Sequence, residues 1–177
     1  MIARHLAPVV AQAGRDYPVV TITGPRQSGK TTLAKAVFPN HPYVTFELSE
    51  NLEAFRDDPK TFFRRYANGV IIDEAQRAPE LFSYIQVEVD QNPTHGRFIL
   101  IGSHNFLLMK SISQSLAGRC AILHLLPFSL SELCGRPMLD LESLSAIPQP
   151  AVLPSRDLFS TLHTGFYPRI HDQHPPV

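Results

Sequence analysis

Short apolar runs alternate with longer amphipathic stretches over the first 130 residues of the chain. The short runs are rich in β-branched residues and predict strands at 18–23, 43–48, 69–73, 97–101 and 120–126. The stretches between them place apolar residues at helical spacing and predict helices at 2–13, 30–38, 51–56, 59–66, 79–90 and 106–116. Such an alternation is typical of a parallel sheet covered by helices. We therefore predict an α/β fold with five parallel strands.

The chain changes character after the fifth predicted strand. Eight of the 16 prolines lie from Pro127 onward, and they interrupt any long helix or strand in that region. Short helices are expected at 128–134 and 155–163, but the segment cannot form a second core. We divide the chain into one domain over 1–133 and a proline-rich extension over 134–177.

The composition narrows the classes of protein to which the chain can belong. Of its 177 residues, 44% are apolar and 18% are charged, so the chain can bury a core and is not disordered. Sixteen Lys and Arg balance sixteen Asp and Glu, and bulk charge therefore does not support coating of DNA or of an anionic membrane. Two cysteines are too few for a disulfide framework or a four-thiolate zinc site. The longest apolar runs, 98–102 and 121–126, are much shorter than a membrane span, and we expect a cytoplasmic protein without membrane contact.

A glycine-bounded loop follows the first predicted strand. It matches the pattern G-x-x-x-x-G-K-[ST] with Gly24, Pro25, Arg26, Gln27, Ser28, Gly29, Lys30 and Thr31. The glycines let backbone N–H groups turn toward an anion, and the following helix adds the positive end of its dipole. Lys30 is expected to neutralise β- and γ-phosphate charge, Thr31 to bind Mg²⁺ through its hydroxyl, and Thr32 to contact the α-phosphate. Because the pattern lies between a strand and a helix, as this chemistry requires, we predict a nucleotide site.

Two carboxylates stand at the end of the third predicted strand. The apolar residues Val70 to Ile72 are followed by Asp73 and Glu74, 43 residues after Lys30. In P-loop ATPases an acid like Asp73 holds Mg²⁺ through water, and one like Glu74 acts as general base for the attacking water. The alternative is an ordinary strand end or helix cap. The adjacent glutamate, and the lack of an N-K-x-D sequence in the chain, favour ATP over GTP.

Two further candidate positions follow from the geometry of such a sheet. In ATPases of this type the strand after the acidic one lies beside the phosphate loop, and its tip here offers Ser103 or Asn105 to the γ-phosphate. The alternative is an ordinary polar turn. Arg119 stands just before the fifth strand, where an arginine can reach the γ-phosphate bound by a neighbouring subunit and would imply a homo-oligomer. The alternative is a surface salt bridge.

With these motifs in place, the sequence resembles the AAA-domain family of bacterial and archaeal ATPases. The resemblance rests on four segments in this order: 21–33, 70–82, 97–103 and 115–119. It implies an ATP-binding P-loop core of the AAA+ lineage, a three-layer sandwich with strand order 5-1-4-3-2. It also implies that the Walker A residues are Gly24, Gly29, Lys30 and Thr31, and that the Walker B acids are Asp73 and Glu74.

The sequence departs from the family in two respects. Ile101 stands at the fourth strand where members usually carry a small hydroxyl residue. Members are also considerably longer, and the chain stops after 165–169, where their C-terminal domain begins. We therefore expect a truncated gene product or a fragment, without a lid over the adenine and with weaker nucleotide binding.

Two functional hypotheses of different class follow. The first is a Mg²⁺-dependent ATPase that binds ATP. The second is a nucleotide-dependent regulatory switch or interaction module with little turnover, which the missing domain favours. A DNA-associated motor rests only on analogy with the family, and the net charge of zero gives it no support. The sequence does not specify a protein partner.

Overall fold

The structure, a computed structural model, describes residues 2–103, 112, 114–137 and 158–171. Its centre is one sheet of five parallel strands in the order β2-β3-β4-β1-β5. The strands are β1 Val19–Thr23, β2 Tyr43–Thr45, β3 Val70–Asp73, β4 Phe98–Ile101 and β5 Cys120–His124. The predicted α/β fold and the predicted strand order, read from the opposite edge of the sheet, are both confirmed.

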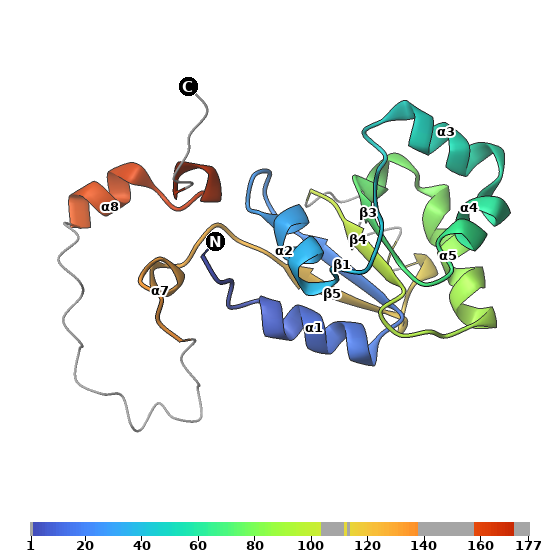
Figure 1. Ribbon diagram of the computed structural model, residues 1–177, viewed down its shortest axis with the longest axis horizontal. Helices are drawn as coiled ribbons and strands as arrows, with labels where there is room; N and C mark the ends of the chain where they lie inside the picture. Colours follow the sequence, from blue (N-terminus) through green and yellow to red (C-terminus); the bar gives the residue numbers. More distant parts are fainter. Residues whose placement is uncertain (1, 104–111, 113, 138–157, 172–177) are drawn as a thin grey trace.

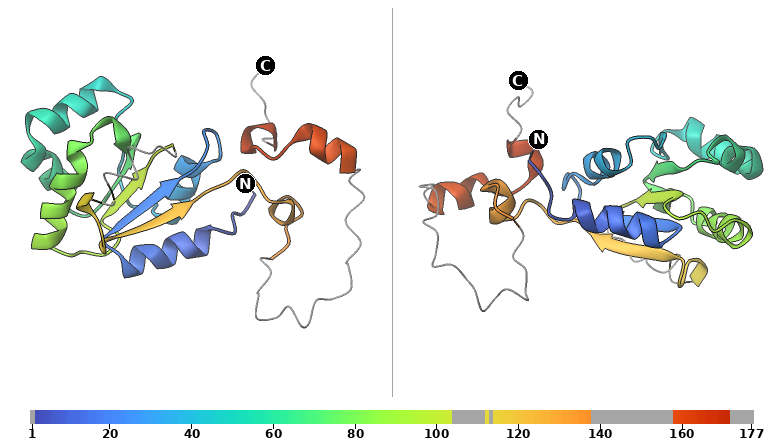
Figure 2. Two further views of the ribbon diagram at one scale, coloured as in Figure 1. Left: turned by 180° about the vertical axis from the view of Figure 1, so that it is seen from behind. Right: turned by 60° about the horizontal axis from the view of Figure 1, so that its bottom comes forward.

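Helices cover both faces of the sheet, so that the core has three layers (Figure 1). The helices of one face are α1 Ala7–Asp16 and α2 Lys30–Val37. Those of the other face are α3 Ser49–Asp57, α4 Pro59–Arg65 and α5 Glu80–Gln91, with the 3-10 turn η1 Ala75–Arg77 between β3 and α5. Beyond the carboxyl ends of the strands lie α7 Leu130–Leu133, α8 Leu158–Thr164 and the 3-10 turn η3 Pro168–His171 (Figure 2). Over the described ranges, none of these helices has the length and apolar character needed to cross a membrane.

Alternate residues of the strands pack into two separate cores. Val20, Ile71 and Ile99 belong to an aliphatic core under α1 and α2. The opposite face packs against a cluster of aromatic rings from Phe46, Phe55, Phe62, Phe63 and Phe98. Full burial of a side chain of this size stabilises the fold by about 1.5–3 kcal/mol. Because a one-residue slip would exchange the two faces, the pattern fixes the face to which each strand-end side chain belongs.

Two elements of the sheet and its covering helices depart from their predicted bounds by three residues or more at one end or both. The strand predicted over 43–48 stops at Thr45, whose hydroxyl accepts a hydrogen bond from Glu47 N at 3.1 Å and turns the chain toward α3. The helix predicted over 2–13 begins only at Ala7, with a proline in its first turn. The residues ahead of α1 are consequently not helical and make contacts across the molecule.

The two ends of the chain meet beyond the carboxyl end of the sheet. Arg4 donates from Nε to Glu132 Oε1 at 3.1 Å, and His5 N donates to the same oxygen at 2.7 Å. Phe128 N donates to Phe166 O at 2.8 Å, which ties the chain after β5 to the segment before η3. Both chain ends therefore lie where a parallel sheet presents its strand-end loops.

Candidate functional site

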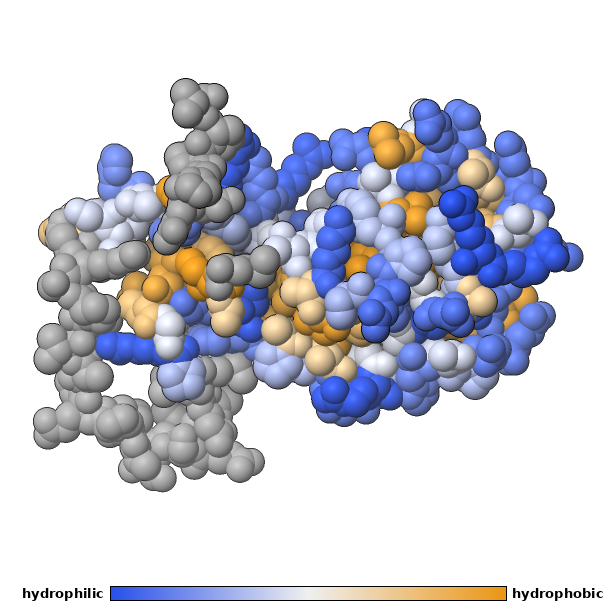
Figure 3. Space-filling view, viewed as in Figure 1, coloured by the Kyte–Doolittle hydropathy of each residue, from blue (hydrophilic) through white to orange (hydrophobic). Residues whose placement is uncertain are grey.

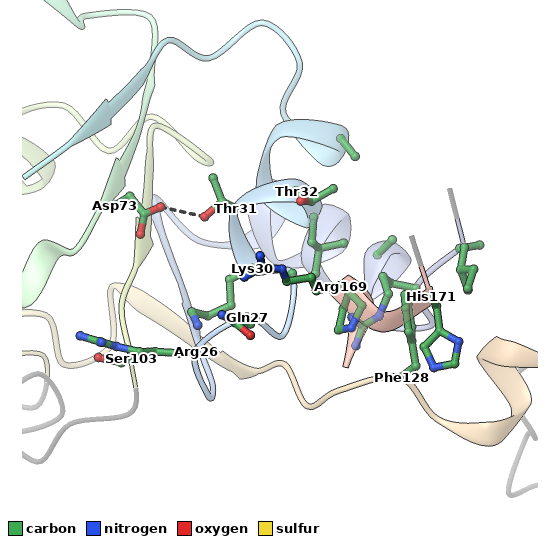
Figure 4. Close-up of a pocket in the computed structure, with 18 of the residues that line it drawn as sticks. Arg26, Gln27, Lys30, Thr31, Thr32, Asp73, Ser103, Phe128, Arg169 and His171 are labelled. Carbon is green, nitrogen blue, oxygen red and sulfur yellow. Dashed lines mark hydrogen bonds between the residues drawn. The ribbon is translucent and has the colours of Figure 1, made fainter. Parts of the chain in front are cut away.

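A cleft of about 1090 Å³ opens at the carboxyl ends of β1, β3 and β4 (Figure 4). The strand side of the cleft is formed by Arg26, Lys30, Thr31, Asp73, Glu74 and Ser103. The terminal side is formed by residues from the two chain ends, Arg4, Phe128, Pro168, Arg169 and His171. A cleft of this size, placed where strand order reverses in a parallel sheet, is typical of a ligand site.

The loop between β1 and α2 is wound closely against the end of β5. Gly24 adopts φ 143°, and a Cβ atom there would collide with the carbonyl group of Leu125, so only glycine fits. Gly29 adopts φ 91° and is the N-cap of α2, without a side chain that caps the helix. Ser28 Oγ is buried and has no hydrogen-bond partner among the described residues. The loop thus offers uncapped helical N–H groups and a hydroxyl, which suit an anion.

Lys30 lies at the centre of the cleft and is held by its own loop. Its Nζ donates to the carbonyl oxygens of Gly24 at 3.1 Å and Pro25 at 2.7 Å. Burial lowers the pKa of Lys30 from its usual value, although the carboxylates of Asp73 and Glu74 act in the opposite direction. A bound phosphate would favour the charged amine further, because a nearby negative charge stabilises it.

Asp73, at the end of β3, faces the first turn of α2. Thr31 Oγ1 donates to Asp73 Oδ2 at 2.7 Å, and the Tyr43 hydroxyl donates to the same oxygen at 2.9 Å (Figure 4). Glu74 N donates to Asp73 Oδ1 at 2.9 Å. Burial and the Asp73 charge raise the pKa of Tyr43 to about 12, so the phenol stays a donor at neutral pH. The predicted metal residues Thr31 and Asp73 are thus in direct contact.

These oxygens fit a magnesium ion. Thr31 gives its hydroxyl hydrogen to Asp73, which leaves the lone pairs of its oxygen available to a metal. A carboxylate has about four acceptor sites, and the described donors use three of those on Asp73. One site is therefore left for a metal-bound water. A hydroxyl and a carboxylate beside a phosphate loop form the donor set that Mg²⁺ prefers.

Glu74 lines the strand side immediately after Asp73. Its φ of 55° is left-handed, at the point where the chain turns from β3 into η1. Gln76 Nε2 donates a hydrogen bond to Glu74 Oε2, and Gln76 Oε1 is buried without a partner in the part of the chain that the structure describes. The Gln76 amide therefore holds the Glu74 carboxylate at the cleft.

Ser103 lies at the strand side, just beyond β4, where the sheet geometry predicts it. Arg26 points toward Ser103 from the loop (Figure 4). The alternative candidate at this tip, Asn105, lies outside the described residues. Three other predicted positions that line the cleft are Gln27, Gly29 and Thr32.

Arg119 lies at the opposite end of the sheet from the cleft, one residue before β5. Its guanidinium pairs with Asp90 of α5 through Nε–Oδ1 at 2.6 Å and Nη2–Oδ2 at 3.0 Å. This contact is the one expected of a surface salt bridge, and Arg119 is not part of the cleft of its own chain. A contact with the nucleotide of a neighbouring subunit stays a prediction.

The sequence analysis missed the terminal side of the cleft. Arg4 Nη1 donates to the loop carbonyl of Ser28 at 2.8 Å, and the Arg4 guanidinium lies over the Phe128 ring, 4.7 Å from its centroid. Arg169 and His171 lie on the same side (Figure 4). Phe128 could have been predicted as a cleft residue, because it follows the carboxyl end of a parallel strand, where ligands bind in such sheets. Arg4 and Arg169 lie in segments without any motif.

Tyr43 was missed as well. β2 pairs with β3 in a register that sets Tyr43 opposite Ile71, two residues before Asp73 and therefore on the same face. The alternation of side chains along each strand shows which residues share a face within that strand. It relates Tyr43 to Asp73 only once the pairing of the two strands is known.

Comparison with known proteins gives matches in sequence and in structure. A family model described as an AAA domain matches residues 16–134. Two uncharacterised proteins, from Mycobacterium bovis and Mycobacterium tuberculosis, are each 41% identical to the chain over 123 residues. That stretch is 69% of this chain and 28% of each relative, so the chain spans less than a third of the relatives' length.

Among solved structures, a Walker-type ATPase of Pyrococcus abyssi superposes with a TM-score of 0.53 and 17% identity, over 83% of this chain and 63% of that protein. Domain III of the replication initiation protein DnaA of Thermotoga maritima gives a TM-score of 0.47 and 20% identity, over 82% and 77% of the two chains. At such low identity, the first of these matches bears on the fold alone.

Proposed function

The chain belongs to the AAA-domain family, and we propose that it binds ATP with Mg²⁺ in the cleft and hydrolyses it to ADP and phosphate. The proposal rests above all on the 2.7 Å hydrogen bond between Thr31 and Asp73, which joins the phosphate loop to the acidic strand end. Residues 42 positions apart meet there with the donor set that a nucleotide-bound magnesium ion requires.

The phosphate loop would bind the triphosphate through three groups. The N-terminus of α2 offers its N–H groups, Lys30 exchanges its two loop carbonyls for phosphate oxygens, and Ser28 offers its hydroxyl. Thr31 and Asp73 would hold Mg²⁺, whose charge neutralises the oxygens of the β- and γ-phosphates. Thr32 would contact the α-phosphate.

Glu74 would act as general base. A water molecule attacks the γ-phosphorus and transfers a proton to the Glu74 carboxylate, and the bond from the γ-phosphorus to the bridging oxygen breaks to release ADP. Gln76 supports this role because its amide holds the carboxylate at the cleft. Ser103 or Asn105 would contact the γ-phosphate, and Arg119 would act on a neighbouring subunit in a homo-oligomer.

The terminal side would take the base and the ribose. Phe128 presents an aromatic ring beside the loop, and Arg4, which lies over that ring, also touches the loop through Ser28. We assign nucleotide binding to a domain over 1–133, to which the extension over 134–177 adds Arg169 and His171 as part of the wall.

Phosphate release by the wild type and by Glu74→Gln tests hydrolysis. We expect the wild type to release phosphate in the presence of Mg²⁺. The variant should bind ATP equally well but release phosphate at least about 100-fold more slowly, because a general base contributes a rate factor of this order. Equal rates for the two proteins would contradict the proposed role of Glu74.

The second candidate function is a nucleotide-dependent switch with little turnover. It is favoured by the contacts of Lys30, whose amine donates to two carbonyl oxygens of its own loop and would have to leave them to bind phosphate. In that case the wild type would bind ATP while releasing no phosphate above the Glu74→Gln level. We also propose a cytoplasmic location, with which the free thiols of Cys120 and Cys134 are compatible.

A further inference from the structure

The Asp73 carboxylate is held by donors from three different elements. Thr31 of α2 and Tyr43 of β2 both donate to Oδ2, at 2.7 Å and 2.9 Å, and Glu74 N donates to Oδ1 at 2.9 Å. Thr31 and Asp73 belong to the two motifs that define the proposed site, whereas Tyr43 belongs to neither. Its hydroxyl nevertheless occupies the last free acceptor site of Oδ2.

The pairing of β2 and β3 explains why Tyr43 reaches this carboxylate. Tyr43 is opposite Ile71 in the parallel ladder, so Asp73 is its diagonal neighbour on the same face. Ile71 packs in the core under α1 and α2, which shows that this face is the one covered by α2. The ring of Tyr43 therefore lies between the edge of the sheet and the helix that follows the phosphate loop.

Lys35 holds the Tyr43 ring from above. Its Nζ lies 3.6 Å from the ring centroid, within the range of a strong cation–π contact. Lys35 is four residues after Thr31 on α2, and residues at this spacing share one face of a helix. The same face of α2 thus carries Thr31, whose hydroxyl contacts Asp73 directly, and Lys35, whose cation holds the ring of Tyr43.

We propose that Tyr43, held by Lys35, is a positioning residue for Asp73 and sets the affinity of the site for the magnesium–nucleotide complex. With both acceptor sites of Oδ2 occupied, the carboxylate cannot rotate freely, and its one open acceptor site lies on Oδ1. The bond is not a mere consequence of deep burial, because Tyr43 is 38% exposed. The inference rests on the proposed function, since it concerns how that site presents its carboxylate.

The test measures binding and not turnover. A fluorescent ATP analogue is titrated at zero Mg²⁺ in EDTA, and then at fixed analogue with rising Mg²⁺, for the wild type, Tyr43→Phe, Lys35→Met and Tyr17→Phe. Tyr17 is the matched control because it is 39% exposed and follows α1 just before the amino end of β1, at the opposite end of the sheet from the cleft.

We expect Tyr43→Phe to raise the Mg²⁺ midpoint about tenfold, the effect of losing a hydrogen bond to a charged group. Lys35→Met is expected to raise it about threefold, because the ring remains but its cation is lost. Tyr17→Phe should leave the midpoint unchanged, and all four proteins should bind the analogue equally in EDTA.

A Tyr43→Phe midpoint equal to that of the wild type would overturn the inference while leaving the proposed function intact. An equal loss of affinity with and without metal would also overturn it, since a merely structural role would act on both. Absence of any Mg²⁺-dependent binding by the wild type would instead remove the proposed function itself.

Discussion

The strand side and the terminal side of the cleft are held in place by different kinds of contact. On the strand side, Asp73 and Ser103 stand at the ends of the paired strands β3 and β4, and Thr31 lies in the first turn of the helix that follows β1, so backbone pairing of the strands fixes their spacing. On the terminal side, Arg4 and Phe128 come from opposite ends of the described core and are joined by side-chain contacts. The first side depends on backbone conformation, and the second depends on a few charged groups.

Arg4 is the centre of the terminal side. It donates to Ser28 O at 2.8 Å, to Leu126 O at 2.5 Å and to Glu132 Oε1 at 3.1 Å. The side chains of Arg4 and Glu132 are only 11% and 5% exposed, so the loss of either partner would leave a largely buried charge unpaired. Through Ser28, a disturbance of this pair reaches the phosphate loop.

Gly24→Ala should have the largest effect, because it breaks the strand side at its backbone. The added Cβ would collide with the Leu125 carbonyl group, and φ 143° is strained for alanine. We expect ATP binding to fall below detection and the free energy of unfolding to drop by about 3 kcal/mol. Calorimetric titration with ATP and denaturation in urea measure the two effects.

Gly118→Ala provides the matched control. Gly118 adopts φ 74°, and a Cβ atom there meets no other atom of the described chain within 4 Å. The substitution adds backbone strain of about 1 kcal/mol without a collision, and ATP affinity should not change. If Gly24→Ala bound ATP as well as Gly118→Ala, the phosphate loop would not need the backbone geometry described above.

Glu132→Gln weakens the terminal side and makes its pH dependence visible. Burial would raise the pKa of Glu132, but the N–H groups of Ser129 and His5 and the Arg4 guanidinium hold it below the usual value of 4.5. An acid whose pKa is lowered by folding stabilises the fold above its unfolded pKa and loses that contribution as the pH falls through its folded pKa. The wild type should therefore lose stability below pH 4.5. Glu132→Gln should start about 1–2 kcal/mol lower at pH 7 and lose less.

Glu80→Gln is the comparison for this experiment. Glu80 pairs with Arg56 at 2.7 Å, but the two side chains are 40% and 49% exposed, so the substitution should cost less than about 1 kcal/mol. Urea unfolding of both variants at pH 7 and at pH 4 measures the difference. An equal loss of unfolding free energy in the two variants would show that the Arg4–Glu132 pair stabilises the fold no more than an exposed ion pair.

Phe128→Ala should have a smaller effect on ATP affinity. It distinguishes the terminal side, proposed to bind the base, from the strand side, proposed to bind the phosphates. The variant should bind ATP about fivefold more weakly, since it loses an aromatic contact to the base. Its affinity for tripolyphosphate, which has no base, should be nearly unchanged. Phe159→Ala is the control, because Phe159 of α8 is 78% exposed and does not line the cleft. An equal loss for both ligands in calorimetric titrations would mean that Phe128 supports the loop and not the base.

The strand side was predictable because its information is local in the sequence. The segment 24–31 carries both the glycines that set the loop and the side chains that act in it. The apolar run ending at Asp73 identifies a buried strand, and the alternation of strands with helices identifies a parallel sheet. These two patterns alone predict that Lys30, Thr31 and Asp73 lie together at the carboxyl end of the sheet.

The terminal side was not predictable because its contacts join segments far apart, without periodicity. Arg4 precedes α1, and its partners Ser28 and Glu132 follow in unrelated segments. The ion pair of Arg119 with Asp90 illustrates the same limit, since the local sequence around an exposed arginine does not reveal its partner. The end of β2 at Thr45 depended on one side-chain hydrogen bond that competes with the ladder.

The central claim is that the cleft binds ATP through the phosphate loop. Calorimetric titration of ATP with Mg²⁺ into the wild type and into Lys30→Met tests it most directly. We predict that the variant binds at least about 100-fold more weakly, because a close charged contact to phosphate is lost. Burial disfavours the charged form of Lys30, so we expect the variant without nucleotide to be about as stable as the wild type, and urea denaturation of both proteins is the control for unfolding. Equal ATP affinity in the two proteins would contradict the account.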